Sequence, residues 1–509
     1  MIKAEFISLD KINKQINRKN FKIILCHGVF DVIHLGHLKY FEYAKNFCKS
    51  PSKLVVSLTS DHFVKKSKGF NRPFFNLKHR INFLKYINCI DYICVSNNAT
   101  ALDVINKTKP DYYAKGPDYN SILKKKIDPN LLKEISQVKK FGGEFLNTKG
   151  ITFSSSNILY NYYGFLDEEK NKFLKLLKKK YTKNYLEDLF FNLKKPNVLI
   201  LGESIIDQYV FTETLGKSSK EAILNTKILN TENYLGGVLV VANHLSQICN
   251  KIKIITYLGK NDKINNIINK KLNKKINIEY IFKKNSPTIV KKRYVDKYSS
   301  TKLFGSYNIN DNLISSAEEN FFLKKIKRNI KKYDLVLLIN YNHGLITNKI
   351  LNFVKNNAKF LALNNQLNSS NNNTYSLDLF NYSDLLCVQE LEARSALRMK
   401  HEKTTILLKN LFKSKKNKNL IITCGKNGSF YKNKNQEGNT PAFAENIVDR
   451  VGAGDLFFLT AAFFLWHKTP LDLVNFISNI SASFKIKNIG NSYHFKIDDL
   501  QKKIFALLK

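Results

Sequence analysis

The sequence has few cysteines and no long apolar run, and both shortages exclude classes of protein. Its seven cysteines include no Cys-x-x-Cys pair, which argues against a disulfide framework or a zinc site. The N-terminus, MIKAEFISLDKINKQ, has no apolar signal core, and the longest apolar run, Leu456 to Trp466, is too short to span a bilayer. We therefore expect a soluble protein of the reducing cytoplasm with no membrane partner.

Acidic residues are also scarce, because 41 aspartates and glutamates stand against 83 lysines and arginines, giving a formal charge of +42. A field of this sign attracts polyanions and raises nucleic acid as a partner. However, lysine and asparagine are spread through nearly every segment, which indicates a chain-wide bias in composition rather than a basic patch. We therefore expect no nucleic-acid partner and keep nucleic-acid binding only as a third hypothesis. The charge should help to gather anionic nucleotides and sugar phosphates.

With 509 residues, the chain exceeds what one hydrophobic core usually serves, and its pattern predicts two α/β domains. The first opens with a strand at Lys22 to Leu25 and the second at Asn197 to Leu201, and each strand ends in a glycine turn. Between them, a lysine-rich helix pattern carries a single apolar stripe. We expect domains at 1–160 and 196–509, with a helical connector at 161–195.

The segment CHGVFDVIHLGHLKYFEYAK, residues 26–45, places His34 and His37 on either side of Gly36, where a helix pattern follows a strand. Two imidazoles three residues apart at a helix N-terminus face the same way and share the positive potential of the helix dipole. Gly36 lets a phosphate approach the backbone. The pattern therefore predicts a site that stabilises phosphate charge during attack on a nucleotide α-phosphate.

Two unrelated surface histidines, or half of a metal site, are the alternatives. A metal site at this spacing would need further Cys, His or Asp ligands nearby, and none is obvious in the sequence. The preceding strand, with Phe30 and Asp31 at its end, strengthens the phosphate interpretation, because the His-Leu-Gly-His motif alone is much weaker.

GVFDVIHLGH resembles the signature of the cytidylyltransferase-like nucleotidyltransferases, which have a Rossmann-like α/β fold. Further motifs follow in the order found in the branch that adenylylates heptose 1-phosphate, and the likeness covers most of residues 20–160. These motifs are Lys68-Gly69, Arg72-Pro73, Arg80, Lys115 to Tyr119 and Phe153 to Ile158. His27 is a departure, because this family usually has an asparagine there.

The resemblance implies that a sugar-1-phosphate oxygen attacks the α-phosphate of a nucleoside triphosphate, with Mg²⁺ screening the leaving pyrophosphate. It assigns the triphosphate to His34 and His37 and the neutralisation of phosphate charge to Lys115. The nucleotide-binding residues that it implies are Phe30, Asp31, Gly36, Arg80, Ser154, Ser155 and Ser156. Plain surface charges at Arg80 and Lys115, and a helix cap at the serines, are the alternatives. ATP is the expected nucleotide, with CTP as the alternative.

A second motif, DRVGAGD at residues 449–455, precedes an apolar helix pattern. Its small residues, Gly452, Ala453 and Gly454, allow consecutive backbone N–H groups to point at an anion at the helix start. Asp455 is then placed to accept the proton of a sugar hydroxyl that attacks a γ-phosphate. A tightly packed helix start capped by an aspartate is the alternative interpretation.

In its context this motif resembles the ribokinase-like (pfkB) sugar kinases, and in particular the heptose-7-phosphate kinase module, over nearly all of residues 196–500. The resemblance implies a ribokinase-like α/β fold in which Asp207 binds sugar hydroxyls and Glu392 joins a Mg²⁺ and phosphate network. The other site residues that it implies are Gly236 and Gly237 over the sugar, Gly425 and Gly428 near ATP, and Gly452, Ala453 and Gly454 as the anion hole.

Four departures from the kinase pattern lie on the acceptor side. Val240 and Gln389 stand where asparagines are usual, and Asn340 and Asn364 stand where aspartates are usual. Buried polar partners discriminate strongly between substrates, so the sugar could differ or the activity could be weak. These departures motivate a second hypothesis, in which the C-terminal half binds a sugar phosphate without catalysis.

Together the two resemblances predict a bifunctional enzyme similar to the ADP-heptose synthesis family, with its two catalytic modules in the opposite order. The C-terminal half would phosphorylate heptose 7-phosphate at C1. After a phosphatase removes the C7 phosphate, the N-terminal half would transfer AMP from ATP to give ADP-heptose for lipopolysaccharide or other surface polysaccharides. Two copies of the chain could form a homodimer.

Overall fold

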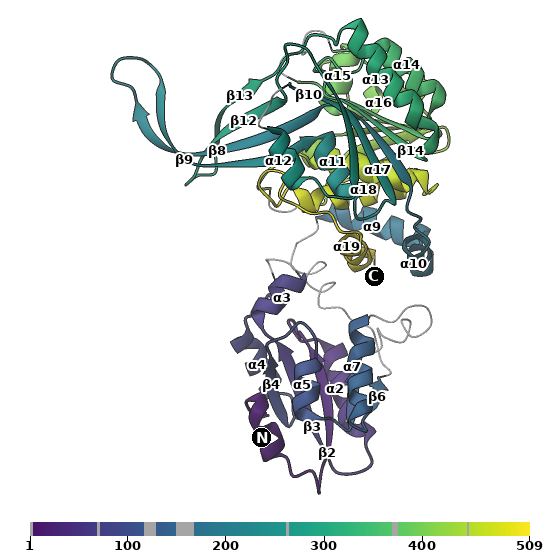
Figure 1. Ribbon diagram of the computed structural model, residues 1–509. Coiled ribbons are helices and arrows are strands. Elements are labelled where there is room, and N and C mark those ends of the chain that lie inside the picture. Colours follow the sequence, from purple (N-terminus) through teal and green to yellow (C-terminus); the bar gives the residue numbers. More distant parts are fainter. Residues whose placement is uncertain are drawn as a thin grey trace. The chain divides into compact units, whose positions relative to one another are not determined.

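The computed structural model describes residues 4–68, 72–116, 129–148, 167–260, 264–368, 375–444 and 447–508. The chain forms two compact units, Met1–Leu166 and Asp167–Lys509, and both are α/β folds (Figure 1). Within the described residues, no helix combines the length and the apolarity that crossing a membrane would require.

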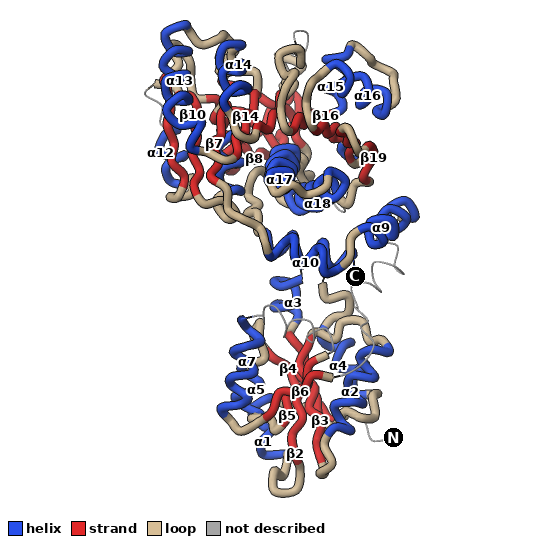
Figure 2. The backbone as a smooth tube through the Cα atoms, turned by 90° about the vertical axis from the view of Figure 1, so that its right-hand side faces the viewer, coloured by secondary structure: helices blue, strands red, loops and turns tan. Residues whose placement is uncertain are grey.

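The first unit is built around a six-stranded parallel sheet with the order β1-β4-β3-β2-β5-β6. The strands are β1 (Glu5–Phe6), β2 (Lys22–Gly28), β3 (Ser52–Thr59), β4 (Tyr92–Ser96), β5 (Tyr112–Lys115) and β6 (Glu144–Asn147). The helices are η1 (Leu9–Lys11), α1 (Ile12–Gln15), α2 (Leu35–Phe47), α3 (Asp61–Lys68), α4 (Leu77–Lys85), α5 (Leu102–Thr108) and α7 (Pro129–Lys140). One core packs α2 and α4 on one face of the sheet, and a second packs α1, α5 and α7 on the other (Figure 2).

This strand order creates a switch point between β2 and β5. The chain builds β3 and β4 on one side of β2 and then crosses over to place β5 and β6 on the other side. In open parallel sheets, ligands bind in the crevice outside the carboxyl ends of the two strands at such a point. The carboxyl end of β2 leads to the His34–His37 segment, and that of β5 carries Lys115.

The second unit contains a nine-stranded sheet with the order β11-β10-β7-β14-β15-β16-β17-β18-β19. Its strands are β7 (Asn197–Gly202), β10 (Lys251–Leu258), β11 (Ile276–Phe282), β14 (Leu335–Asn340), β15 (Leu361–Asn365), β16 (Leu385–Gln389), β17 (Asn419–Thr423), β18 (Ser429–Asn433) and β19 (Glu437–Thr440). The strands from β11 to β17 in this order are parallel, and β18 and β19 are antiparallel. The order reverses between β7 and β14, which defines a second switch point.

Helices cover both faces of this sheet, with α13 to α16 on one side and α17 and α18 on the other (Figure 2). The described helices of the second unit are α9 (Glu168–Lys180), α10 (Lys183–Phe191), α11 (Val238–Leu245), α12 (Ile264–Lys271), α13 (Ser316–Asn329), η3 (Ile330–Lys332), α14 (Asn348–Asn357), α15 (Glu390–Leu397), α16 (Thr404–Ser414), η4 (Gly425–Asn427), α17 (Ala453–Trp466), α18 (Leu471–Lys485) and α19 (Ile497–Leu508). The apolar run that begins at Leu456 is buried within α17, because this helix packs against β14 and β16 of the sheet and against α18.

The helices expected as a connector, α9 and α10, belong to the second unit. The Tyr181 hydroxyl donates a 2.6 Å hydrogen bond to Asp472 of α18, and Phe173 packs against Phe443 and Phe476. The apolar stripe predicted for this segment therefore packs on the body of the second unit.

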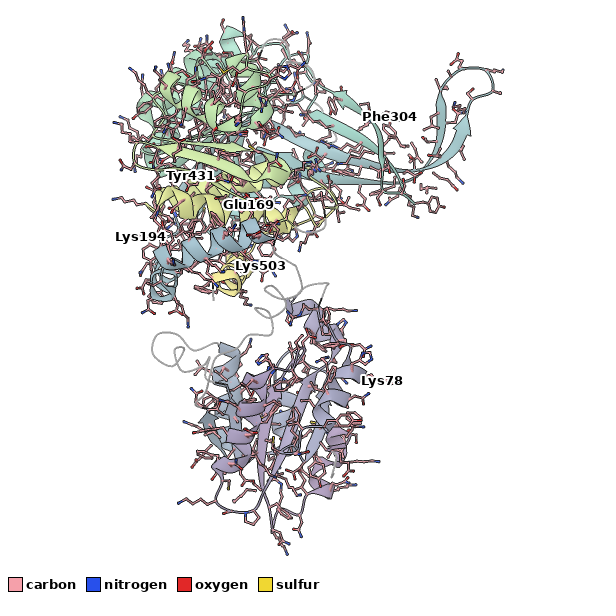
Figure 3. The ribbon with its side chains drawn as sticks, turned by 180° about the vertical axis from the view of Figure 1, so that it is seen from behind. Lys78, Glu169, Lys194, Phe304, Tyr431 and Lys503 are labelled. Atoms are coloured by element: carbon pink, nitrogen blue, oxygen red, sulfur yellow. The ribbon has the colours of Figure 1, made fainter. Side chains whose placement is uncertain are left out.

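A smaller four-stranded sheet, ordered β13-β12-β8-β9, extends from the body of the second unit (Figure 1). Its strands are β8 (Ser204–Lys217), β9 (Leu224–Gly237), β12 (Ile289–Asp296) and β13 (Lys302–Asn308). Large apolar side chains are exposed on it, including Leu215, Ile228 and Phe304. Phe304 is labelled in Figure 3. We call this sheet the lid sheet; β8 begins next to the carboxyl end of β7, so its first residues lie at the edge where ligands bind.

Candidate active sites

In the first unit, His34 and His37 form one stack at the positive end of α2. His34 is the N-cap and His37 lies in the first turn, with the partly exposed Gly36 between them. The two rings stack with centroids 3.8 Å apart and planes 22° apart. Because the helix dipole adds positive potential there, the stack is suited to binding a phosphate.

Phe30 supports this stack from the core rather than from the solvent side. Its ring is 6% exposed and lies edge-on to His37, with centroids 5.3 Å apart. The backbone at Phe30 has a φ of 46°, which turns the ring back over the end of β2. A Cβ at Gly28 would lie 2.9 Å from that ring, so this strand end requires glycine.

Lys115 lies on the other side of the switch point, at the end of β5. Its ammonium nitrogen is 3.5 Å from the His27 carbonyl oxygen and 3.8 Å from the Glu134 carboxylate. The Tyr113 hydroxyl also donates to Glu134, at 2.8 Å. The site therefore contains a mostly buried lysine with a buried carboxylate as its counter-ion.

The histidine that departs from the family pattern, His27, has its own hydrogen-bond partners. Its Nδ1 lies 3.2 Å from the Ser57 hydroxyl, and its Nε2 lies 3.4 Å from the Thr59 hydroxyl. Burial, followed by the charge of Lys115, lowers the pKa of His27 to about 3. The imidazole is therefore neutral at physiological pH and bridges the ends of β2 and β3.

Asp31 anchors the loop that follows α3. Its carboxylate, which is 1% exposed, accepts hydrogen bonds from Arg72 Nε at 2.7 Å and from the Phe74 and Phe75 amides at 2.9 Å. The carboxylate of Asp31 therefore holds the loop at residues 72–75 in place.

Arg80 is fully buried, in contrast to the surface charge considered as an alternative from the sequence. Its guanidinium donates to the Val29 carbonyl oxygen at 2.6 Å, the Thr59 carbonyl oxygen at 2.9 Å and the Asp61 carboxylate at 2.7 Å. It therefore joins the carboxyl ends of β2 and β3 to the start of α3. The three candidate serines, Ser154, Ser155 and Ser156, lie outside the described residues.

In the second unit, the Gly-Ala-Gly-Asp motif forms the N-terminus of α17. Gly452 is the N-cap with a φ of 79°, and a Cβ placed at Gly454 would have no neighbouring atom within 4 Å. The first backbone N–H groups of a helix have no intrahelical acceptor. They are therefore available here to an anion that approaches the open side of Gly454.

Asp455 lies in the first turn of α17 and is held by residues from two strand ends. The Tyr341 hydroxyl, after β14, and Gln366 Nε2, after β15, each donate a 3.0 Å hydrogen bond to Oδ1 of Asp455. Burial raises the pKa of Asp455 to about 6, although both hydrogen bonds and the charge of Lys291 lower it. A carboxylate with this pKa is suited to act as a general base near neutral pH.

The residues expected on the acceptor side, Asp207, Gly236 and Gly237, lie on the lid sheet. Asp207 of β8 makes an ion pair with Arg293 of β12 and accepts a 3.1 Å hydrogen bond from Asn491. Lys291 is the register partner of Asp207 across β8 and β12, and burial lowers its pKa while Asp207 raises it. A Cβ at Gly236 would lie 2.4 Å from Asp207 Oδ2, so glycine makes room for this carboxylate.

Glu203 is a site residue that sequence reasoning missed. Its fully buried carboxylate accepts hydrogen bonds from the backbone amides of Tyr341 at 2.9 Å and His343 at 3.1 Å. A Cβ at Gly237 would lie 2.3 Å from the backbone carbonyl oxygen of Glu203. The sequence signal that could have identified Glu203 is its position directly after Gly202, the glycine that ends the buried strand β7. Glu203 fixes the turn that presents Tyr341 to Asp455.

Asp449, the first residue of the motif, connects the lid sheet to the anion-binding turn. It accepts hydrogen bonds from the Tyr209 hydroxyl at 2.5 Å and from Lys302 Nζ at 2.7 Å, and from the amides of Val451 and Gly490. Burial alone would raise its pKa, but the bonds from Lys302, Tyr209 and the two amides lower it to about 2. Asp449 is therefore a fixed negative charge beneath the lid.

Two of the departures form part of the polar framework at the strand ends. Asn340 Nδ2 donates to Asn342 Oδ1 at 2.9 Å and to Asn365 Oδ1 at 2.8 Å. Asn364 Nδ2 donates to the Cys387 carbonyl oxygen at 2.8 Å, within the sheet. Where the kinase pattern has carboxylates, Asn340 thus bonds to other side-chain amides and Asn364 bonds to a backbone carbonyl oxygen. Val240, a third departure, is buried in α11.

Glu392 has a capping role rather than the geometry of an open metal ligand. Its carboxylate accepts hydrogen bonds from the Gln389 amide at 2.6 Å, in the capping box of α15, and from the Leu367 amide at 2.9 Å. Burial raises its pKa to about 7, although both bonds lower it. The described part of the chain contains no group of three or more His, Cys, Asp or Glu side chains that could hold a metal ion.

Gly425 and Gly428, expected near ATP, form the turn between β17 and β18. Their φ values are 57° and 80°. A Cβ at Gly428 would lie 1.9 Å from the Thr440 carbonyl oxygen. This turn follows the carboxyl end of β17 and therefore lies on the ligand-binding edge of the sheet.

The two folds and their sites define a two-part transferase, with a nucleotidyltransferase-like unit followed by a kinase unit. The chain belongs to the pfkB family of carbohydrate kinases, whose family model matches residues 195–486. The cytidylyltransferase-like family model matches residues 25–160. Both family resemblances and both expected folds are thereby confirmed.

Similar proteins match the N-terminal part. It is 35% identical over 130 residues to bifunctional protein HldE of Helicobacter pylori, which covers 26% of this chain and 27% of that protein. It is 32% identical over 140 residues to bifunctional protein HldE of Campylobacter fetus, covering 28% and 29%. The matches thus span under a third of each relative. The order of the two modules is reversed relative to HldE, as expected.

Among solved structures, phosphofructokinase-2 from Escherichia coli in complex with potassium is similar in fold. The likeness covers 62% of this chain and 99% of that chain, with a TM-score of 0.50 and 12% sequence identity. At this identity the likeness shows the fold alone.

Proposed function

We propose that the chain is a bifunctional sugar-phosphate enzyme of ADP-heptose synthesis. Its C-terminal unit phosphorylates heptose 7-phosphate at C1. Its N-terminal unit transfers AMP from ATP to heptose 1-phosphate, after a separate phosphatase has removed the C7 phosphate. The HldE likeness of residues in the first unit supports the heptose assignment, and the pfkB match supports the kinase step.

The kinase step is carried by Asp455 at the N-terminus of α17. Asp455 takes the proton of the attacking sugar hydroxyl, whose oxygen forms a bond to the γ-phosphorus as the bond to ADP breaks. Tyr341 and Gln366 hold the carboxylate oxygen in one orientation. The backbone amides of Gly454 and its neighbours stabilise charge on the transferred phosphoryl group.

The acceptor is an anionic sugar, and this assignment is supported by two cations on β12. Lys291 and Arg293 are two residues apart on β12, so their side chains lie on the same face of the lid sheet, beside Asp207. A neutral sugar would need hydroxyl partners only. A guanidinium and an ammonium together suit a phosphate on the sugar.

The nucleotidyl step is carried by the His34–His37 stack and Lys115. These groups bind the triphosphate from the two sides of the switch point and stabilise the charge of the pyrophosphate that leaves. Mg²⁺ enters with the nucleotide, because this ion commonly binds through substrate phosphates and water. ATP is the preferred nucleotide, with CTP as the alternative.

Assays that follow ADP release and pyrophosphate release separately test the two steps. We expect ADP release with heptose 7-phosphate and ATP, and pyrophosphate release with heptose 1-phosphate and ATP. A screen of other sugar phosphates serves as the control. If neither heptose substrate reacts while another sugar phosphate does, the heptose assignment is wrong and the transferase assignment stands.

A second function is favoured by the amides at the strand ends, in which the C-terminal unit binds a sugar phosphate without catalysis. The Asn340, Asn342 and Asn365 side chains bond to one another, leaving fewer carboxylates for a sugar. An intact chain that releases no ADP with any sugar phosphate, but binds one in calorimetry, would establish this alternative.

We also propose that two copies associate through the lid sheet. Its exposed Leu215, Ile228 and Phe304 are costly to leave in water. The mass of the chain in solution, measured by light scattering with and without Ile228→Asp and Phe304→Asp, tests the association.

All seven cysteines are free thiols, which supports a reducing compartment such as the cytoplasm.

A further inference from the structure

Lys485 places a buried ammonium group beside the turn that begins α17. It is the last residue of α18, and its side chain is 0% exposed. A Cβ at Gly452, the N-cap of α17, would lie 3.4 Å from Lys485 Cε. The lysine therefore runs alongside the backbone that forms the anion-binding turn.

Local hydrogen bonds do not account for this buried charge. Within the described residues, Lys485 Nζ makes a single long hydrogen bond, to the Asn488 carbonyl oxygen at 3.5 Å. Asn491 Oδ1 lies 2.2 Å from the same Cβ position at Gly452, and it is buried without a hydrogen-bond partner in that part of the chain. Burial of an ammonium ion is costly unless other charges compensate it.

The compensating charges are the carboxylates of the kinase site. Burial lowers the pKa of Lys485 below its ordinary value, and the charge of Lys302 also lowers it, whereas Asp449, Asp207 and Asp455 raise it and so favour the charged form. Asp449 and Asp455 are the two ends of the anion-binding segment. The charged form of Lys485 is thus stabilised by the carboxylates at both ends of this segment.

We propose that Lys485 is a built-in cation of the phosphoryl-transfer site. As a positioning residue, it holds the 449–455 turn in shape and adds a fixed positive charge behind the N-terminus of α17. A free monovalent cation could supply the same charge at this place, but a tethered ammonium is always present. The kinase therefore needs no potassium or ammonium ion. This inference rests on the proposed kinase function of the second unit.

The test compares the intact chain with Lys485→Ala, Lys485→Met and the matched control Lys487→Ala, which changes an exposed lysine two residues away. ADP release is measured in potassium, ammonium or tetramethylammonium chloride at equal ionic strength. We expect the parent and Lys487→Ala to be insensitive to the cation. Lys485→Ala should lose about 100-fold in kcat in tetramethylammonium and regain about tenfold or more in potassium or ammonium.

Lys485→Met fills the space without a charge, so it should lose a similar factor and gain nothing from either small cation. If Lys485→Ala does not fold, the test depends on Lys485→Met and on the cation insensitivity of the parent. A parent that requires potassium, a Lys485→Met variant of full activity, or a folded Lys485→Ala variant that neither cation rescues would overturn the inference.

A thermal unfolding series separates this inference from the kinase proposal. The unfolding midpoint of Lys485→Ala should be higher in potassium or ammonium than in tetramethylammonium, and that of the parent should not change. A parent that releases no ADP with any sugar phosphate contradicts the kinase proposal. Cation-independent midpoints for Lys485→Ala contradict the role of Lys485 whatever the activity of the parent.

Discussion

The Tyr341 hydroxyl donates a 3.0 Å hydrogen bond to the Asp455 carboxylate, so a residue from the end of β14 controls the basicity of the proposed general base. The bond stabilises the ionised form of Asp455 and lowers its pKa against the effect of burial. Tyr341→Phe should therefore raise the pKa of Asp455. We expect the acid limb of the pH profile of kcat/KM for ADP release to move to higher pH.

The matched control for this change is Tyr493→Phe, which removes a buried hydroxyl without a hydrogen-bond partner in the described residues. Its pH profile should coincide with that of the parent. An acid limb that moves to lower pH in Tyr341→Phe would contradict the role assigned to the hydrogen bond.

Asp455 should be essential for one of the two reactions only. Asp455→Asn keeps the shape of the side chain but removes the base, so ADP release should fall by about 100-fold to 10,000-fold. Pyrophosphate release by the first unit should be unchanged, which serves as the internal control. In the parent, kcat/KM for ADP release should fall as the pH drops below about 6, because protonated Asp455 cannot accept a proton. ADP release that survives Asp455→Asn would support the binding-module alternative.

His37 should matter for the other reaction. His37→Ala removes one ring of the stack at the start of α2, and pyrophosphate release should fall by about 100-fold because phosphate charge loses a stabilising group. ADP release should not change. His79→Ala is the matched control, since His79 is an exposed histidine on α4 of the same unit. Equal effects of the two substitutions would refute the phosphate role.

Lys291 should determine the preference for a phosphorylated acceptor. Lys291→Met removes an ammonium group that faces Asp207 across the lid sheet, and KM for the sugar phosphate should rise by about tenfold to 100-fold. KM for the same sugar without its phosphate should change little. Lys292→Met, whose side chain points to the opposite face of β12, is the control. A uniform loss with both acceptors would show that Lys291 does not read the phosphate.

Arg80 should stabilise the first unit rather than bind a ligand. Arg80→Met removes three hydrogen bonds, and it leaves the Val29 and Thr59 carbonyl oxygens and Asp61 without this partner. The free energy of unfolding of this unit should fall by about 3–5 kcal/mol, the usual cost of breaking a buried charged network. Denaturant unfolding of the whole chain, followed by hydrogen exchange in the first unit, measures the loss. Lys78→Met, at an exposed neighbouring lysine (Figure 3), should have little effect.

Local spacing was enough to predict the short-range parts of both sites. His34 and His37 are three residues apart at a helix start, and one helical turn brings such residues together whatever the rest of the fold does. In the same way, consecutive small residues before Asp455 form a helix N-terminus from their own backbone. The two α/β units also follow from alternating strand and helix patterns, which are local properties.

Tertiary structure alone decided which distant charges meet. Glu203 follows β7, Tyr341 follows β14 and Lys291 lies on β12, so their placement around Asp455 depends on strand order and register, which no short pattern contains. Burial in the tertiary structure determined the roles of two further basic residues. The resemblance assigned Arg80 to the nucleotide, and Lys485 reads as an ordinary basic residue in a lysine-rich sequence. Only the packing around them shows that both side chains are fully buried, which makes Arg80 a structural residue and Lys485 a candidate internal cation.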